Sequence, residues 1–402
     1  MHHDLAAERF VAQKKGQLVN LLDQMCQKLE VTETQYKAAT RSYEAVGAWL
    51  ADASSTYLAG AQIYAQGSIA LGTAIKPVGR NEFDVDLVCY LPNLNAASDS
   101  RFIKALVGHR LKENATYRGM LEEKKRCWRL NYANEFHLDI TPSISNPSCS
   151  RGGELVPDKT LSKWKPTNPK GYVERFETYA AITPKVHMQI LAFDEARADS
   201  DVAPFPSQTS SKPLLKRIVQ LLKRHRDHSF RDPQGADLAP ISIIITTLAG
   251  WAYAKCAAQR TYTDAFDFLT AVIREMPNFI KTETRGGRPC FIVENETTTG
   301  ENFADKWNQD PRLAESFFQW HKEALSSIES LLRIEGVDQF AESLSKGFGA
   351  NTEQVRDTLA TLSNPINKAR SNGLLAVAPV LGLVPSSAIG AVHVPKNTFF
   401  GR

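Results

Sequence analysis

The chain has 402 residues, which is enough for two domains with hydrophobic cores of their own. Hydrophobic residues make up 43% and charged residues 23%, proportions that are ordinary for a soluble globular protein. Because 48 Lys and Arg face 44 Asp and Glu, the net charge of +4 does not call for an obligate nucleic-acid partner.

The six cysteines form no Cys-x-x-Cys pair, and their spacing fits neither a zinc ribbon nor a disulfide scaffold. We therefore expect reduced thiols in a cytoplasmic protein. The polar N-terminus, rich in helix-forming residues, shows no signal peptide.

The first 60 residues predict helices. Apolar residues recur at helical spacing from residue 4 onward, as at Leu18, Leu21, Leu22 and Met25. A second helix is expected over Ala45 to Leu58, bracing the sheet that follows.

A Gly-Ser turn and two aspartates in an apolar run come next, in Gln66 to Thr73 (QGSIALGT) and Phe83 to Leu87 (FDVDL). Residues i and i+2 of a strand share a face, so Asp84 and Asp86 project together. Two adjacent carboxylates on a mostly apolar strand repel each other and are poorly solvated, and a divalent cation removes both problems. The turn offers backbone N–H groups and a hydroxyl to a phosphate chain.

A third aspartate lies in a predicted hairpin. Arg126 to Tyr132 and Glu135 to Pro142 predict two strands, and His137 and Asp139 share the polar face of the second. Three aspartates in one sheet could hold two Mg²⁺ ions about 3.5–4 Å apart. Alone, an Asp-x-Asp pair is more often a solvated strand face and a Gly-Ser pair only a turn, but the joint pattern favours nucleotidyl transfer from a nucleoside triphosphate. We expect His137 to be a supporting partner rather than a catalytic base.

Further along, a helix from Ser100 to Lys112 is expected to cover the sheet. Ser145 to Asn168, rich in Pro, Gly and Ser, predicts a long loop near the active face. Asp199 to Pro213 is the expected connection into a helical half that runs to about Leu362. Beyond about Ser371 a Gly/Pro/Ala-rich tail is expected to be flexible.

Two uncharged stretches have the composition of membrane spans. Ala239 to Ala254 is too short and predicts a buried helix, and four Pro and Gly residues interrupt Gly373 to Val394. No membrane partner is expected.

The motifs QGS, GT, DVDL and LDI resemble the signature of the polymerase-β-like nucleotidyltransferase superfamily. Three later segments resemble the bacterial cGAS/DncV-like nucleotidyltransferases (CD-NTases): LLKRIVQLLKRHRD from Leu214, PISIIITTLA from Pro240 and ENFADKW from Glu301. The resemblance runs from about Gln66 to Trp307.

This resemblance implies a bilobal α+β protein: a nucleotidyltransferase core with bracing helices in residues 1–200, a helical domain in 201–370 and a tail in 371–402. The implied activity is Mg²⁺-dependent synthesis, with two metal ions (Mn²⁺ being an alternative), of a cyclic di- or trinucleotide second messenger. The substrates would be ATP or GTP, the product one such as cyclic GMP-AMP, and the setting bacterial antiphage (CBASS) defence.

The resemblance also assigns residues. Asp84, Asp86 and Asp139 would bind the metal ions, and Asp139 would help to deprotonate the attacking hydroxyl. Gln66, Gly67 and Ser68 would cradle the donor triphosphate.

Lys223 and Ser242 match the lysine and serine that contact the triphosphate in the family, although a solvated helix face also explains the basic cluster around Lys223. Asn302 and Asp305 of ENFADKW could read a base edge, or Asn302 could cap a helix.

Several alternatives share the triad. A linear oligoadenylate synthase or RNA-tailing enzyme has the same motifs, but a processive RNA enzyme should carry a basic track that this charge balance does not supply. A small-molecule nucleotidyltransferase fits the large helical half less well, and a catalytically silent binding protein fits the intact triad poorly.

The tail, ending Phe400-Gly401-Arg402, could also be conjugated to a partner protein, although Arg402 departs from a terminal glycine and a docked or disordered tail is the simpler reading.

Overall fold

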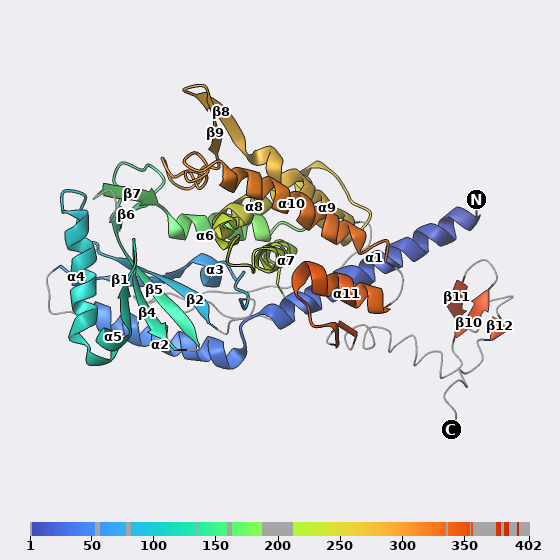
Figure 1. Ribbon diagram of the computed structural model, residues 1–402, viewed down its shortest axis with the longest axis horizontal. Coiled ribbons are helices and arrows are strands. Elements are labelled where there is room, and N and C mark those ends of the chain that lie inside the picture. The colour runs from blue at the N-terminus through green and yellow to red at the C-terminus, as the bar shows by residue number, and fades with distance from the viewer. Residues whose placement is uncertain are drawn as a thin grey trace.

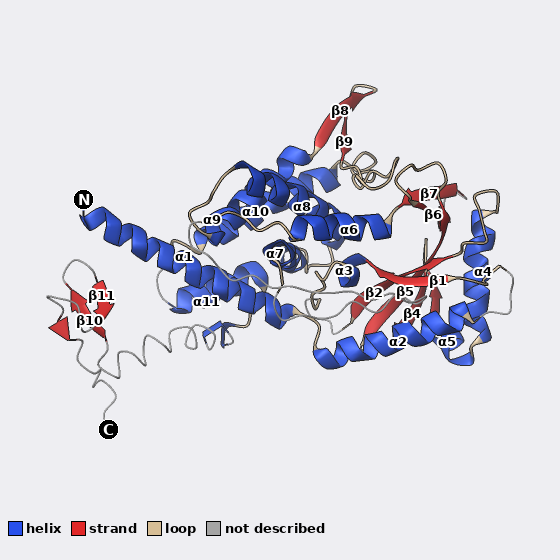
Figure 2. Ribbon diagram, turned by 180° about the vertical axis from the view of Figure 1, so that it is seen from behind, coloured by secondary structure: helices blue, strands red, loops and turns tan. Residues whose placement is uncertain are grey.

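The computed structural model describes residues 2–52, 57–77, 82–133, 135–158, 163–186, 212–334, 337–353, 355–356, 375–378, 382–385 and 392–393. The expected connection at 199–213 lies almost wholly outside these ranges. Two separate hydrophobic cores confirm the predicted bilobal α+β architecture. Figures 1 and 2 show the sheet lobe at one end of the molecule and the helical lobe beside it.

The sheet lobe is built on β1 (Gln62–Gln66), β2 (Phe83–Tyr90), β5 (Phe136–Ser145), β4 (Trp128–Tyr132) and β3 (Leu121–Glu123), in that spatial order. Only the central pair, β2 and β5, is parallel. Apolar residues alternate along the strands, so that Val85, Leu87, Leu138 and Ile140 are completely buried. The hairpin predicted around Asp139 is therefore confirmed.

Helices cover the apolar face of this sheet. They are α2 (Glu33–Ala51), α4 (Ser100–Glu113) and α5 (Ala115–Met120). Thr32 starts α2 through a capping box with Gln35, and the helix ends at Ala51, so the helix predicted over Ala45 to Leu58 was placed too late. The short α3 (Gly67–Ala70) follows β1 on the side of the sheet opposite α2 (Figure 1).

Two predictions about the sheet lobe were wrong. The segment 145–168 is not a long loop, because β6 (Glu154–Asp158) and β7 (Lys163–Thr167) form a hairpin that pairs with the end of β5. The first helix, α1 (His2–Leu29), does not brace the sheet either. Its buried residues Leu18, Leu21 and Leu22 belong to the core of the helical lobe.

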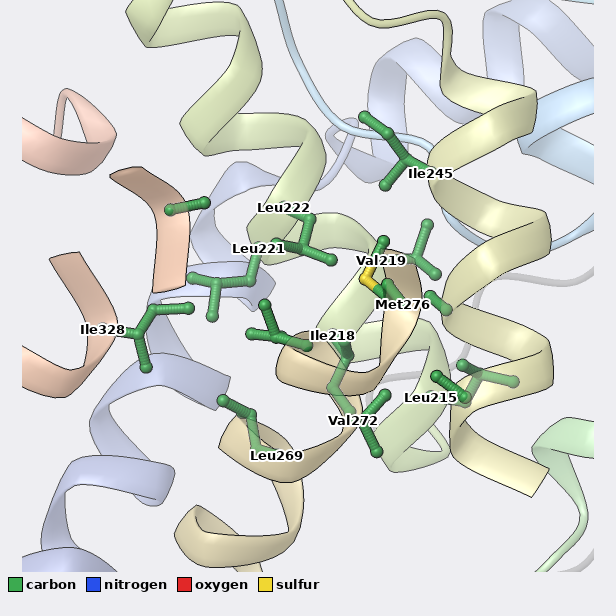
Figure 3. Close-up of a cluster of buried hydrophobic side chains, with 14 of the residues drawn as sticks. Leu215, Ile218, Val219, Leu221, Leu222, Ile245, Leu269, Val272, Met276 and Ile328 are labelled. Carbon is green, nitrogen blue, oxygen red and sulfur yellow. The ribbon is translucent and has the colours of Figure 1, made fainter. Parts of the chain in front are cut away.

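The helical lobe packs around α7 (Leu214–Ser229), as Figure 3 shows for its apolar side chains. Leu215, Ile218, Val219 and Leu222 of α7 are fully buried, as their helical spacing predicts. The helices with the main contacts to α7 are α1, α6 (Pro169–Ala180), α8 (Ser242–Gln259), α10 (Arg312–Ser330) and α11 (Val337–Phe348), and α9 (Ala265–Glu275) packs against α1, α8 and α10. The turns η1 (Ala236–Leu238) and η2 (Met276–Phe279) complete this lobe.

One helix in the described residues, Ala236–Gln259, is long and apolar enough to pass a membrane-span test, but 61% of its apolar window is buried inside the protein. That burial is typical of a core helix, as predicted for this stretch. All six cysteines are free thiols, as expected from their spacing.

Two further small sheets are separate from the large sheet of the sheet lobe. The strands β8 (Lys281–Arg285) and β9 (Arg288–Ile292) form a hairpin that projects from the helical lobe (Figure 2). The tail, expected to be flexible, contains a small antiparallel sheet of β10 (Leu375–Ala378), β11 (Gly382–Pro385) and β12 (Val392–His393).

Candidate active site

The three predicted aspartates lie on adjacent central strands. In the parallel register of β2 and β5, Asp86 is opposite Asp139 and Asp84 is opposite His137. Alternation along each strand turns these side chains to the face away from the buried Val85 and Leu138. The chain therefore brings together carboxylates that are more than 50 residues apart in sequence.

Asp86 is the aspartate whose charge is least well accommodated. Burial, and then the charges of Asp139 and Asp84, raise its pKa to about 7, although Arg129 and Lys223 act in the opposite direction. A carboxylate that is desolvated among other acids is a favourable place for a hard divalent cation. The donor set thus fits Mg²⁺ or Mn²⁺.

The Gly-Ser turn lies directly against Asp86. Gln66 is opposite Asp86 in the β1–β2 register, and Gly67 follows with a φ of 64°. A Cβ atom at Gly67 would lie 2.3 Å from Asp86 Oδ2, so no other residue fits without moving that carboxylate. The Ser68 carbonyl accepts a 2.9 Å hydrogen bond from Thr73 N, which closes the turn, and Gln66 Nε2 lies 3.5 Å from Thr141 Oγ1.

Sequence reasoning missed Arg129. It lies on β4 opposite Asp139, and its guanidinium contacts Asp139 through Nε–Oδ1 and Nη2–Oδ2, both at 2.7 Å. Nη2 also lies 3.2 Å from Asp84 Oδ1. Arg129 thus pairs with both Asp84 and Asp139. In this arrangement no three His, Cys, Asp or Glu side chains of the described residues converge as metal ligands. The two predicted strands leave only residues 133 and 134 for the turn and would pair Arg129 with Leu138, so its pairing with Asp139 became visible only in the observed register, with Tyr132 opposite Phe136.

Lys223 reaches from α7 to the loop that follows the Gly-Ser turn. Its Nζ donates to the Thr73 carbonyl at 2.9 Å. Burial is the main reason that its pKa falls to about 8, and the nearby charge of Arg226 adds to the effect. The structure thus places this cation within one hydrogen bond of the turn and close enough to Asp86 for their charges to interact.

Ser242 is the first residue of α8 and lies next to a different cation. Its Oγ is 3.2 Å from Arg226 Nη2, on the same helix as Lys223. Ser242 and Lys223 are therefore linked through α7, since each contacts that helix or belongs to it.

Asn302 and Asp305 have distinct surroundings. Asn302 braces the chain after β9: its Nδ2 donates to the Phe291 carbonyl at 3.0 Å, and its Oδ1 accepts from Val293 N at 2.9 Å. These contacts favour a structural role over base recognition. Asp305 pairs at 3.0 Å with Lys165 of β7 and so links the two lobes.

His137 lies beside the triad without joining it. Its Nε2 is 3.2 Å from Glu82 Oε2, just before β2. This contact agrees with the supporting role expected for His137.

Comparison with known proteins gives consistent matches. A profile of the Second Messenger Oligonucleotide or Dinucleotide Synthetase (SMODS) domain matches residues 17–179. A c-di-GMP synthase of Roseivirga ehrenbergii is 31% identical over 389 residues, covering 96% of this chain and 98% of that protein. The cyclic dinucleotide synthase CdnG of Bradyrhizobium diazoefficiens is 25% identical over 372 residues, covering 83% of each chain.

The solved structure of that CdnG in complex with GTP superposes with a TM-score of 0.63 at 18% identity, covering 86% of this chain and 99% of that one. At this identity the match establishes the shared fold.

Proposed function

Since the chain belongs to the bacterial cGAS/DncV-like nucleotidyltransferases and is a synthase of the cyclic-dinucleotide type, we propose that it joins two molecules of GTP into cyclic di-GMP. The observation that carries the choice of base is the match to a c-di-GMP synthase along nearly the whole of both chains. In each of two steps, a ribose hydroxyl oxygen bonds to the α-phosphorus of a triphosphate while pyrophosphate leaves. The second step closes the ring.

The proposed roles follow from the geometry of the sheet. Asp84, Asp86 and Asp139 would hold two Mg²⁺ ions, for which Mn²⁺ could substitute, and the bound ions would supply charge stabilisation for the triphosphate and the attacking hydroxyl. Asp139, on the neighbouring strand, orients the acceptor hydroxyl and takes part in its deprotonation. Two observations support these roles: burial and neighbouring carboxylates raise the pKa of Asp86, and Asp86 lies opposite Asp139 in the sheet.

Donor triphosphate binding is assigned to the turn and to α7. Gln66, Gly67 and Ser68 present backbone N–H groups and polar side chains to the phosphates. Lys223 adds a cation, and its present bond to the Thr73 carbonyl puts it beside the same turn. Ser242, whose hydroxyl contacts Arg226, is proposed to donate a hydrogen bond to the phosphate chain at a point farther from the turn.

The decisive experiment is incubation of the purified protein with each NTP and with all four, in Mg²⁺ or Mn²⁺, followed by phosphatase treatment and mass spectrometry. We expect a phosphatase-resistant cyclic di-GMP from GTP alone, absent from the Asp84→Ala/Asp86→Ala variant. Cyclic GMP-AMP from mixed nucleotides would correct the base assignment but keep the enzyme class. Linear products would support the oligoadenylate or tailing alternative and contradict ring closure.

We further propose that the messenger acts in the cytoplasm in antiphage signalling. Phages should form fewer plaques on cells that express the protein with its natural neighbouring genes than on cells that carry the Asp84→Ala/Asp86→Ala variant. Equal plaque counts would remove the proposed defence role without affecting the enzymatic one.

Conjugation of the tail to a partner protein is a separate proposal. Its last residues, including Gly401 and Arg402, lie outside the described residues. Deletion of the last few residues should abolish a higher-mass form of the protein in cells; an unchanged higher-mass form would end this idea.

A further inference from the structure

Arg129 is a cation inside the acidic site, and no part of the nucleotidyltransferase motif includes it. Its planar guanidinium forms a two-pronged contact with Asp139, with both N–O distances at 2.7 Å. This geometry is the strongest that an arginine and a carboxylate adopt. Only 22% of the Arg129 side chain is exposed, so water screens the pair weakly.

The contacts of Arg129 with the two aspartates are unequal. Asp139 is 14% exposed and receives two short contacts, whereas Asp84 is 59% exposed and receives one contact of 3.2 Å. An incoming cation can therefore displace Arg129 from Asp84 much more easily than from Asp139. Each carboxylate oxygen has two lone-pair directions, so Asp139 can keep its arginine and still accept another ligand.

We propose that Arg129 is a positioning residue and a resident counter-charge: it keeps Asp139 aimed at the acceptor side and releases Asp84 when a divalent cation enters. The first ion then enters between Asp84 and Asp86, where one long contact must be exchanged. The Asp139 side remains partly neutralised until substrates bind. This inference rests on the proposed metal-dependent function.

Two consequences separate the charge of Arg129 from its shape. The affinity of the nucleotide-free protein for a divalent cation should depend on the positive charge at position 129, because that charge opposes the incoming ion. Turnover should depend on the planar fork, which holds both oxygens of Asp139 and which lysine cannot reproduce.

The test measures Mn²⁺ binding to the nucleotide-free protein by calorimetry and electron paramagnetic resonance. Arg129→Gln should bind Mn²⁺ about tenfold more tightly than the unmodified protein. Arg129→Lys, which keeps the charge, should stay within about threefold of it. The matched control is Arg126→Gln, since Arg126 pairs with Asp158 instead of the triad and its loss should leave Mn²⁺ affinity unchanged.

Kinetics provide the second readout. Both Arg129→Lys and Arg129→Gln should lose kcat by about 10- to 100-fold, with a smaller change in KM for the nucleotide. Unchanged Mn²⁺ affinity in Arg129→Gln, no Mn²⁺ binding by any variant, or full turnover in Arg129→Lys would each overturn the proposal. If the unmodified protein makes no cyclic product, the proposed function fails, but the comparison of Mn²⁺ affinities still decides the role of the Arg129 charge.

Discussion

Asp86 is a residue whose ionised form lowers the stability of the fold but suits the proposed metal site. Its carboxyl lies under the Gly67 backbone and beside two other aspartates, so its folded pKa of about 7 is far above the ordinary value of 3.8. The folded protein therefore holds the Asp86 proton more tightly than the unfolded chain does. It follows that this residue lowers the free energy of unfolding as pH rises from about 4 to about 7, and that the full penalty applies above pH 7.

This sign leads to a stability prediction for Asp86→Asn, measured by thermal melting in EDTA. At pH 8 the variant should melt a few degrees above the unmodified protein, because the unfavourable charge is gone. The difference should shrink as the pH approaches 4. Asp84→Asn is the comparison: it relieves one of the repulsions on Asp86 but also removes a 59% exposed partner of Arg129, so its gain at pH 8 should be smaller than that of Asp86→Asn. A pH-independent difference for Asp86→Asn would contradict the assigned cause.

Gly67 allows a second prediction at the scale of one residue. Gly67→Ala forces a side chain into the left-handed region and pushes Asp86 Oδ2, which lies 2.3 Å from the new Cβ. Gly60→Ala is a matched control, since Gly60 has a similar φ of 73° but its nearest neighbour is 3.7 Å away. Both variants should lose about 1–2 kcal/mol of stability through backbone strain.

Only Gly67→Ala should also lose nucleotidyl transfer, by at least tenfold, because only there does the new methyl group displace a proposed metal ligand. Initial rates and urea denaturation of the two variants distinguish these effects. Equal rates would show that the Gly67–Asp86 approach is not needed for activity.

At the scale of secondary-structure elements, α7 supports the loop behind the Gly-Ser turn. Lys223 donates to the Thr73 carbonyl, Gln220 to Ala74 and Arg224 to Lys76, at 2.9, 3.2 and 3.4 Å. A single helix thus holds three carbonyl groups of the loop, at residues 73, 74 and 76. The position of the turn depends in this way on the packing of the helical lobe.

The end of α1 is tied to the same helix by a buried charge. Glu30, with a side chain 9% exposed, accepts from Lys212 at 2.8 Å, Arg217 at 2.6 Å and Gln220 at 3.1 Å. Glu30→Ala should destabilise the protein by about 3 kcal/mol, because it leaves two cations buried without this partner. Urea denaturation measures the loss. Glu33→Ala removes an exposed partner of Lys37 and should leave the urea midpoint nearly unchanged.

The elements also show which parts of the fold could be predicted from sequence. Strict alternation predicted β2 and β5, and with them the shared face of the triad, because one face of each strand is buried. The β6–β7 hairpin was missed because Pro157 and Pro166 argue against strands. The β8–β9 hairpin had a readable signal in Gly286-Gly287, both of which have a positive φ.

What remained unpredictable depends on contacts between distant segments. Apolar spacing shows that α1 buries one face, but it does not say which lobe receives that face. The pairing of Arg129 with Asp139 required the exact register of β4 and β5, and the contacts of Lys223 required the docking of the two lobes.

Across the whole molecule, the two lobes must keep a fixed relation, since the triad lies on one lobe and the proposed triphosphate cation Lys223 on the other. Lys165 of β7 and Asp305 of the helical lobe join them through an ion pair of 3.0 Å. Their side chains are 26% and 44% exposed, so the pair should add less than about 1 kcal/mol to stability. Its effect should appear in substrate binding rather than in melting temperature.

Charge reversal tests this link. Lys165→Asp places two acids face to face and Asp305→Lys places two cations face to face, so each should raise KM for GTP several-fold by driving the lobes apart, with melting temperatures nearly unchanged. The double variant Lys165→Asp/Asp305→Lys restores the attraction and should return KM close to its original value. Steady-state kinetics on the three variants gives the coupling between the two sites. If the double variant is as impaired as the two single changes combined, the pair does not hold the lobes for catalysis. Their relation would then depend on other contacts, such as those of α7 with residues 73–76 and the bond from Arg151 to the Glu296 carbonyl.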